Sequence, residues 1–205
     1  MELEQAFAPS VTIAEFFEEV VPALHRERLD DFRQFTDVAL IVCLKLLDTG
    51  DVFSVELGLD GCTVEDDEMV DFPIVTIKGW DKYWQEVKRH SLELLQELDR
   101  RQEELADSFR VTPAFLDDFG KLDAVIDVTI TETEDHPEIT FSLVLNDYEP
   151  YEDASRFSVE IPLSRLRAVA RGEADVVEAA RALDIGGDYR FAAYLGGLFL
   201  THAED

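Results

Sequence analysis

Residues 123–162 read DAVIDVTITETEDHPEITFSLVLNDYEPYEDASRFSVEIP. Three runs in this stretch, 123–132, 138–146 and 156–162, are rich in branched and aromatic residues that alternate with polar ones along much of their length. Because successive side chains of a strand point to opposite faces, this pattern predicts three β-strands. Asp135-His136-Pro137 supplies the turn residues expected between the first two strands.

A similar order of strands precedes this stretch. The nearly continuous apolar run at 38–47 predicts a strand buried on both faces, and the alternation at 53–59 predicts a strand with one solvated face. A short strand near Cys62–Val64 and another at 72–78 follow. The first part of the chain is therefore also expected to form a sheet.

The strands of the two parts match at a nearly constant spacing. Ala39 and Phe72 lie 85 positions before Ala124 and Phe157, and the strand that begins at residue 53 lies 88 positions before the one at residue 141. Such an offset indicates an internal duplication. Amphipathic patterning shared by unrelated strands is the alternative explanation.

Helical periodicity surrounds both groups of strands. Thr12 and Glu15 have the spacing of a capping box, and Thr112-Pro113 and Gly186-Gly187-Asp188 are typical helix starts. The expected helices cover residues 12–33, with a kink or break at Pro22, about 80–107, 113–119, 164–171, 175–182 and 189–200, and a short strand covers Leu183–Ile185. The predicted fold is α+β and consists of two related α-β-β-β-α halves, residues 1–107 and 108–205. Each half is expected to form a mainly antiparallel curved sheet with helices packed on one face. Separate domains and one continuous domain are both compatible with this pattern.

The composition limits the classes of partner. The 205 residues contain 46 Asp plus Glu and 18 Lys plus Arg, giving a net charge of −28, with the acidic residues dispersed along the chain. This charge argues against nucleic acid and against anionic membranes, whereas a salt-rich habitat or a basic protein partner would each suit it. No apolar run approaches the length of a membrane span and no signal peptide is visible, so we expect a cytoplasmic protein without stable membrane insertion.

No catalytic or metal site is recognisable in the sequence. Cys43 and Cys62 are expected to be buried, reduced thiols, and the four histidines lie on helix faces or the surface without partners at metal-ligand spacing. Adjacent acidic residues are expected by chance in so acidic a chain. We therefore expect no enzymatic activity, no metal and no cofactor.

The last fifty residues resemble the sterol carrier protein type 2 family. The carrying residues are Phe157-Ser-Val-Glu-Ile-Pro-Leu-Ser-Arg-Leu, then Leu183-Asp-Ile-Gly-Gly-Asp, then Leu195-Gly-Gly-Leu-Phe199. The opening helix at Thr12 and the strand before Trp80 follow the order of the same family, although the first half lacks the short Gly-Asp strand and the second lacks one strand between Asn146 and Arg156. The resemblance implies an apolar space between sheet and helices that is closed by the C-terminal helix.

The final helix is apolar on all sides, so it must be covered on several of them. Core packing between the halves, a lid over an apolar cavity and a homodimer interface are three explanations. The candidate lining residues for a cavity are Trp80, Trp84, Phe141, Leu143, Phe157, Val159, Ile161, Leu166, Ile185, Phe191, Tyr194, Leu195, Leu198 and Phe199. The expected function is non-enzymatic binding of a lipid or other apolar small molecule. The alternative is an acidic protein-interaction or accessory module with no open cavity, which would bind a basic protein or assist an enzyme.

Overall fold

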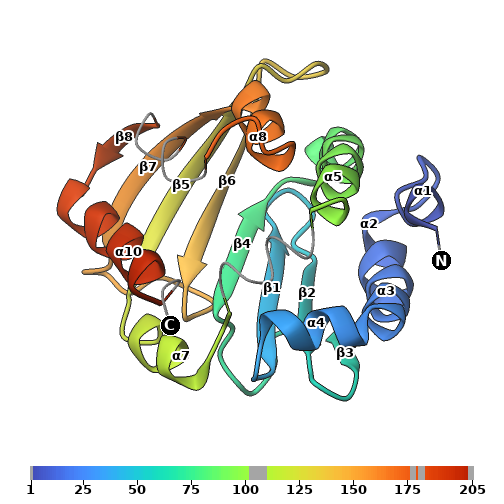
Figure 1. Ribbon diagram of the computed structural model, residues 1–205, viewed down its shortest axis with the longest axis horizontal. Coiled ribbons are helices and arrows are strands. Elements are labelled where there is room, and N and C mark those ends of the chain that lie inside the picture. The colour runs from blue at the N-terminus through green and yellow to red at the C-terminus, as the bar shows by residue number, and fades with distance from the viewer. Residues whose placement is uncertain (1, 102–109, 176–178, 180–182, 203–205) are drawn as a thin grey trace.

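The computed structural model describes residues 2–101, 110–175, 179 and 183–202 (Figure 1). The elements of the first part are α1 (Leu3–Ala6), α2 (Ile13–Glu15), a π-helical turn (Phe16–Val20), α3 (Val21–Glu27), α4 (Leu29–Phe35), β1 (Leu40–Leu46), β2 (Val52–Leu57), β3 (Cys62–Glu65), β4 (Val75–Gly79), a 3₁₀ turn (Asp81–Tyr83) and α5 (Trp84–Asp99). Those of the second part are α7 (Pro113–Phe119), β5 (Ala124–Thr131), β6 (Glu138–Leu145), β7 (Ser155–Pro162), α8 (Leu163–Ala170), β8 (Asp184–Gly187) and α10 (Tyr189–His202).

In the described residues, eight strands form one continuous sheet in the order β3-β2-β1-β4-β6-β5-β7-β8 (Figure 1). Two neighbouring pairs, β1 with β4 and β5 with β7, are parallel, and the other five are antiparallel. The predicted α+β class with a mainly antiparallel sheet is therefore confirmed. The join between the halves is the antiparallel pair β4–β6, which makes the sheet unbroken.

Both halves contain a hairpin, a later strand parallel to the first strand of that hairpin, and then a helix. The first half has an additional strand, β3, between its hairpin and the parallel strand β4. The strand registers differ, however. Val42 pairs with Val75, whereas Asp127, which lies 85 positions after Val42, pairs with Ser158 and not with Glu160. Internal duplication thus stays a prediction, and a constant offset of 85 does not describe both parallel pairs.

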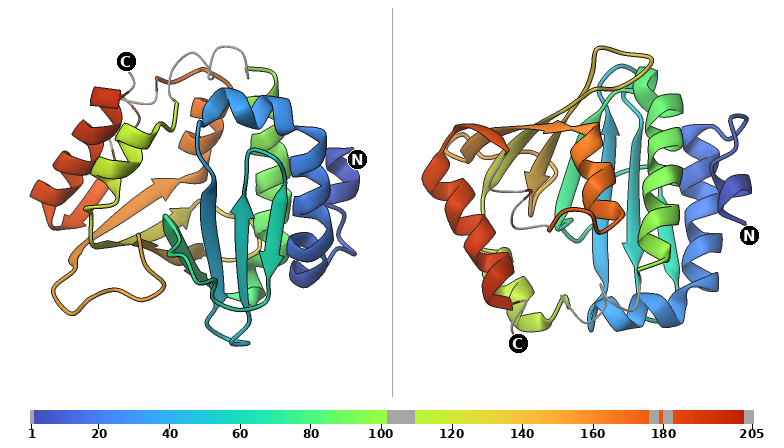
Figure 2. Two further views of the ribbon diagram at one scale, coloured as in Figure 1. Left: turned by 90° about the horizontal axis from the view of Figure 1, so that it is seen from below. Right: turned by 45° about the horizontal axis from the view of Figure 1, so that its top comes forward.

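The helices cover one face of this sheet, as the sequence predicts (Figure 2). The register places Phe53, Ile77 and Phe157 in one row across the sheet on the same face. Phe17 of the π-helical turn stacks on Phe53 with ring centroids 5.3 Å apart, and Phe191 of α10 contacts Phe157 at 6.1 Å. The apolar residues of alternate strand positions therefore form a single inner face.

Several helix boundaries follow from local hydrogen bonds. The capping box of Thr12 and Glu15 is formed, and Thr112 accepts a hydrogen bond from Phe115 N. The first helical segment is continuous from Ile13 to Glu27, with a π-helical turn directly before Pro22, where a kink or break is predicted. A separate break follows at Arg28. The expected helix from residue 80 begins at Trp84 after a 3₁₀ turn and reaches Asp99. Its predicted end, and nearly all of the helix expected at 175–182, lie outside the described residues.

α10 packs on the second half of the sheet. Leu198 is buried with Phe115 and Phe119 of α7 and with Phe157 of β7 in the main hydrophobic core. Asp188 begins the helix, because its carboxylate accepts hydrogen bonds from the amides of residues 190 and 191. α10 packs on β7 and α7, so it contributes to the core of the second half, whereas the predicted core packing was between the two halves.

The opposite face of the sheet is more polar. Lys45 and Lys78 point from it to Glu149, and Lys45 also binds Glu68. Cys43 is fully buried on this face, and burial raises the pKa of its thiol, so it is protonated and inert. Both cysteines are free, as expected, but Cys62 is only partly buried. In the part of the chain that is described, no helix is long and apolar enough to cross a membrane.

Candidate binding cavity

A cavity of about 330 Å³ lies between the inner face of the sheet and helices α5 and α8, with the π-helical turn at one side. Its wall is almost entirely apolar and comes from both halves of the chain. The main contributors are Leu44, Ile77, Val87 and Leu94 from the first half and Ile130, Phe141 and Leu166 from the second. The cavity therefore spans the β4–β6 seam.

Gly79, the last residue of β4, leaves part of this space open. It is buried and lines the cavity, yet a Cβ atom built on it would meet no heavy atom within 4 Å. Its φ lies outside the left-handed region, so a larger residue would not strain the backbone. A side chain at this position would project into empty space.

Few polar side chains reach the wall, and His90 is the most buried of them. His90 and Ser91 lie on α5, and Thr140 lies on β6. The His90 side chain is 5% exposed, and its Nε2 lies 3.4 Å from Oε1 of Glu86. Its Nδ1 is buried and has no hydrogen-bond partner in the described residues. Burying a polar nitrogen without a hydrogen bond lowers the stability of the fold, because the atom loses its contact with water and gains no partner.

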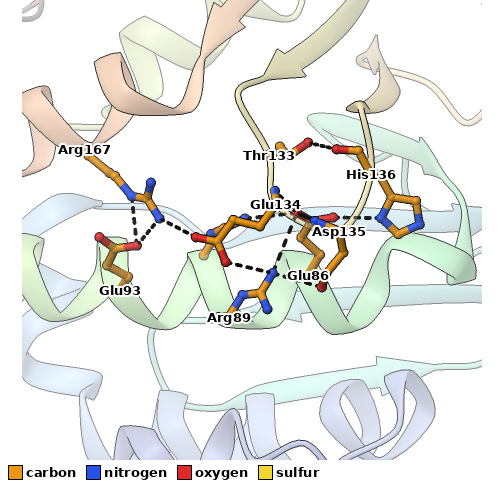
Figure 3. Close-up of polar contacts among 9 residues, drawn as sticks. Glu86, Arg89, Glu93, Thr133, Glu134, Asp135, His136 and Arg167 are labelled. Carbon is orange, nitrogen blue, oxygen red and sulfur yellow. Dashed lines mark hydrogen bonds and ion pairs between the residues drawn. The ribbon is translucent and has the colours of Figure 1, made fainter.

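Glu86, one turn before His90, fixes α5 to the second half (Figure 3). Its side chain is 1% exposed. Oε1 accepts hydrogen bonds from the amides of Glu134 and Asp135, at 2.6 and 2.9 Å, and Oε2 lies 2.7 Å from Nδ1 of His136. These three residues form the turn between β5 and β6, so one carboxylate clamps a helix of the first half onto a hairpin of the second.

The protonation of Glu86 follows from these contacts. Burial alone would raise its pKa, but the hydrogen bonds from Asp135 N, His136, Glu134 N and His90 outweigh burial and lower the pKa from 4.5 to about 2. Glu86 is consequently ionised at neutral pH. An ionised carboxylate only accepts hydrogen bonds, so the proton shared with His90 belongs to Nε2 of the imidazole.

Ion pairs extend this contact toward α8. Arg89 binds Asp135 at 3.0 Å and lies 3.6 Å from Glu134. Arg167 of α8 binds Glu93 of α5 at 2.8 Å and lies 3.8 Å from Glu134 (Figure 3). The turn, α5 and α8 are thus joined along one rim of the cavity.

The N-terminal segment at residues 8–11 packs against α5. Lys88 of α5 is 1% exposed and donates hydrogen bonds to the carbonyl oxygens of Ala8, Pro9 and Val11. Trp84 Nε1 donates to the same Val11 oxygen at 3.2 Å. Both side chains therefore hold residues 8–11 against α5.

The candidate lining residues from the sequence fall into three groups. Trp80, Trp84, Phe141 and Leu166 line the cavity. Eight others belong to the main core or pack against it: Leu143, Phe157, Val159, Ile161, Ile185, Phe191, Leu195 and Leu198. Tyr194 and Phe199 of α10 are 56% and 41% exposed. The cavity thus lies under α5, whereas the sequence resemblance places it under the final helix.

Sequence reasoning missed the polar residues beside the cavity. The sequence predicts His90 on a helix face or the surface; it lies on α5, but its side chain is buried. The contacts of Glu86 and His136 were not predicted. The spacing of four between Glu86 and His90 was a visible signal, because such residues share one helical face. Their contact with the β5–β6 turn had no local signal.

A second apolar groove lies between α3, α4 and the end of α5, lined by Leu24, Phe32, Leu98 and others. His25 in its wall is 8% exposed, and neither ring nitrogen has a hydrogen-bond partner in the described residues. Burial lowers the pKa of His25, so this ring is neutral at pH 7. Strands and helices of both halves line the α5 cavity, which is partly open to solvent, whereas this groove lies within the first half.

Nowhere in the described ranges do three or more histidine, cysteine or acidic side chains come together in a way that could hold a metal ion. The chain matches no family model, and no curated protein matches it. The likeness to sterol carrier proteins remains a prediction from the sequence, and the assignment of function must come from the cavity.

Proposed function

We propose that this chain binds a small, largely apolar molecule in the cavity beneath α5 and does not catalyse a reaction on it. The observation that supports this proposal is an apolar cavity of about 330 Å³ between sheet and helices. Ligand sites are typically concave, mostly apolar and roughly 300–1,000 Å³ in volume. The sterol carrier resemblance adds the same expectation of an apolar space between these two layers.

The volume is too large for an ordinary packing defect. Protein interiors contain few voids larger than one water molecule, whose share of liquid volume is about 30 Å³. Apolar cavities of about 150 Å³ remain dry and bind benzene. The cavity of about 330 Å³ has roughly twice the volume of such a benzene-binding cavity, so its apolar walls suit a molecule about twice as large as benzene.

The two tryptophans make this proposal testable with the natural chain. Trp80 and Trp84 are the only tryptophans in the sequence, and both line the cavity. Nonan-1-ol, which does not absorb in the near ultraviolet, should change tryptophan fluorescence in a saturable way. Mass spectrometry of an organic extract of the purified protein should identify a co-purifying apolar compound.

Gly79→Val is the decisive variant. The new side chain would occupy the cavity without backbone strain, so we expect affinity for nonan-1-ol to fall at least about tenfold while the melting temperature is maintained or raised. Gly61→Val is the matched control, because Gly61 is exposed in a turn and its Cβ would also meet nothing within 4 Å. Equal affinity in the Gly79 variant and the wild type would contradict the proposed site, as would the absence of saturable binding.

A further inference from the structure

The outer side of α10 is exposed and mainly apolar. The helix packs its other side on β7 and α7, and it lies at the end of the molecule remote from α1 (Figure 2). Apart from Phe199, its exposed residues recur at intervals of three and four and therefore share one face. They are Tyr189, Arg190, Ala193, Tyr194, Gly196, Gly197 and Thr201. In the part of the chain that is described, no other element packs on this face.

This face carries no carboxylate, although the chain is strongly acidic. Residues 189–203 are the longest stretch of the sequence without Asp or Glu, in a chain with 46 acidic residues. Two molecules with a net charge of −28 repel each other, and the repulsion is weakest where neither of them presents a carboxylate. The exposed face of α10 is therefore a place where two copies can meet.

Arg190 makes this face complementary to itself in an antiparallel pair. Its exposed guanidinium makes no ion pair with the described residues, and it lies in the first turn of α10, where the helix dipole disfavours a cation. The other end of α10 carries the negative end of the dipole and adjoins Asp118, whose Oδ2 lies 3.5 Å from Nε2 of His202. When two α10 helices pack antiparallel, Arg190 of each copy lies beside the negative end of the other.

We propose that the exposed face of α10 is the contact surface of a symmetric homodimer, in which the α10 helices of two copies pack antiparallel about a two-fold axis near Gly196 and Gly197. Each copy contributes the same residues to such an interface. A Cβ atom built on either glycine would meet no heavy atom within 4 Å, so a second helix can approach closely there. Tyr189 and Tyr194, which are 64% and 56% exposed, supply the aromatic area that is typical of interfaces.

Other partners suit this face less well. A basic protein would be attracted to the carboxylates elsewhere on the chain and not to a face with an arginine and no acid. An anionic membrane would repel a molecule with a charge of −28. A second copy offers both an equally acid-free face and the matching negative helix end.

Analytical ultracentrifugation of the unmodified chain tests for the dimer. α10 has 14 residues and is about 21 Å long, so a single pair of these helices forms a small interface. We expect reversible dimerisation with a dissociation constant of about 10 µM. A chain that is monomeric up to about 0.5 mM would overturn the proposal. If that monomer sediments with phosphatidylcholine vesicles, the face binds a lipid surface instead.

Gly197→Gln tests the close approach of the two helices. Glutamine adds bulk without charge and favours a helix more than glycine does, so the melting temperature of the monomer at about 1 µM should be maintained or raised. The dissociation constant of the dimer should nevertheless rise at least about tenfold. Gly61→Gln is the control, because Gly61 is exposed in a turn with the same free space, and it should not affect dimerisation. Unchanged dimerisation of Gly197→Gln would contradict the proposed contact.

Arg190→Glu tests the antiparallel arrangement. An acidic residue in the first turn suits the dipole of its own helix, so the monomer should not lose stability, whereas the dissociation constant of the dimer should rise at least about fivefold. Arg26→Glu is the matched control: Arg26 is an exposed arginine of α3 without an ion pair in the described residues, so the net charge changes equally while α10 is unaltered. Equal weakening in both variants would refute the antiparallel arrangement.

Discussion

Replacing Glu86 with glutamine should destabilise the fold by about 3 kcal/mol at pH 7 and by less than half as much at pH 3. The substitution keeps the shape of the side chain and removes its charge. The buried carboxylate accepts hydrogen bonds from two backbone amides of the β5–β6 turn and from His136, and a neutral amide cannot accept all of them equally well.

The magnitude follows from the pKa. The folded protein lowers the pKa of Glu86 from 4.5 to about 2, and each unit corresponds to about 1.4 kcal/mol. A carboxyl group with a lowered pKa contributes its full stabilisation above the unfolded-state value. That contribution is lost as the pH falls from about 4.5 toward about 2, so the difference between variant and wild type shrinks across this range.

Urea unfolding followed by tryptophan fluorescence at several pH values measures this difference. Glu93→Gln is the control, because Glu93 pairs with Arg167 and Arg171 at a partly exposed site and its loss should cost at most about 1 kcal/mol. A Glu86 variant within about 0.5 kcal/mol of the wild type at pH 7, or a difference that does not change with pH, would refute the role assigned to this carboxylate.

Three further predictions concern other contacts. Lys88→Met should cost about 2–3 kcal/mol and speed hydrogen exchange in residues 8–11, since three carbonyl oxygens lose their buried donor; unchanged exchange there would contradict it. Tyr148→Phe should cost about 1 kcal/mol and expose the Met69 amide, which donates to the Tyr148 hydroxyl at 2.8 Å; protection of that amide in the variant would count against it. Raising KCl from 0.1 to 2 M should raise the melting temperature by about 5 °C or more through screening of the −28 charge, and calorimetry showing no rise would disprove this.

The strands and helix starts could be predicted because their determinants are local. Alternating side chains define the strands around Phe53 and Val128, and the caps at Thr12, Thr112 and Asp188 act on amides two or three residues later. The π-helical turn directly before Pro22 lies where the sequence predicts an irregularity, since proline lacks the N–H that an α-helical turn needs. The break at Arg28 has no proline or glycine beside it and was not predicted.

The site was less predictable because its parts are distant in sequence. Ile77 and Leu143, which flank the seam, pair across 66 positions, and Glu86 meets a turn about 50 positions later. Periodicity identifies which side chains face inward, but it does not show where they fail to fill the interior. The apolar composition of α10 therefore suggested a lid over a cavity, whereas its buried residues pack into the main core.

The position of the cavity has a physical explanation in the way the halves are joined. At the β4–β6 seam, α5 of the first half must cover strands of both halves, while α10 and α7 cover the outer strands of the second. β4 ends there in Gly79, which contributes no side chain to the inner face. Glu86 meanwhile holds α5 to the β5–β6 turn, so the helix cannot collapse onto the gap without breaking the hydrogen bonds of a buried charge. An apolar space between the sheet and α5 is the expected result, and this is the space that the proposed ligand would occupy.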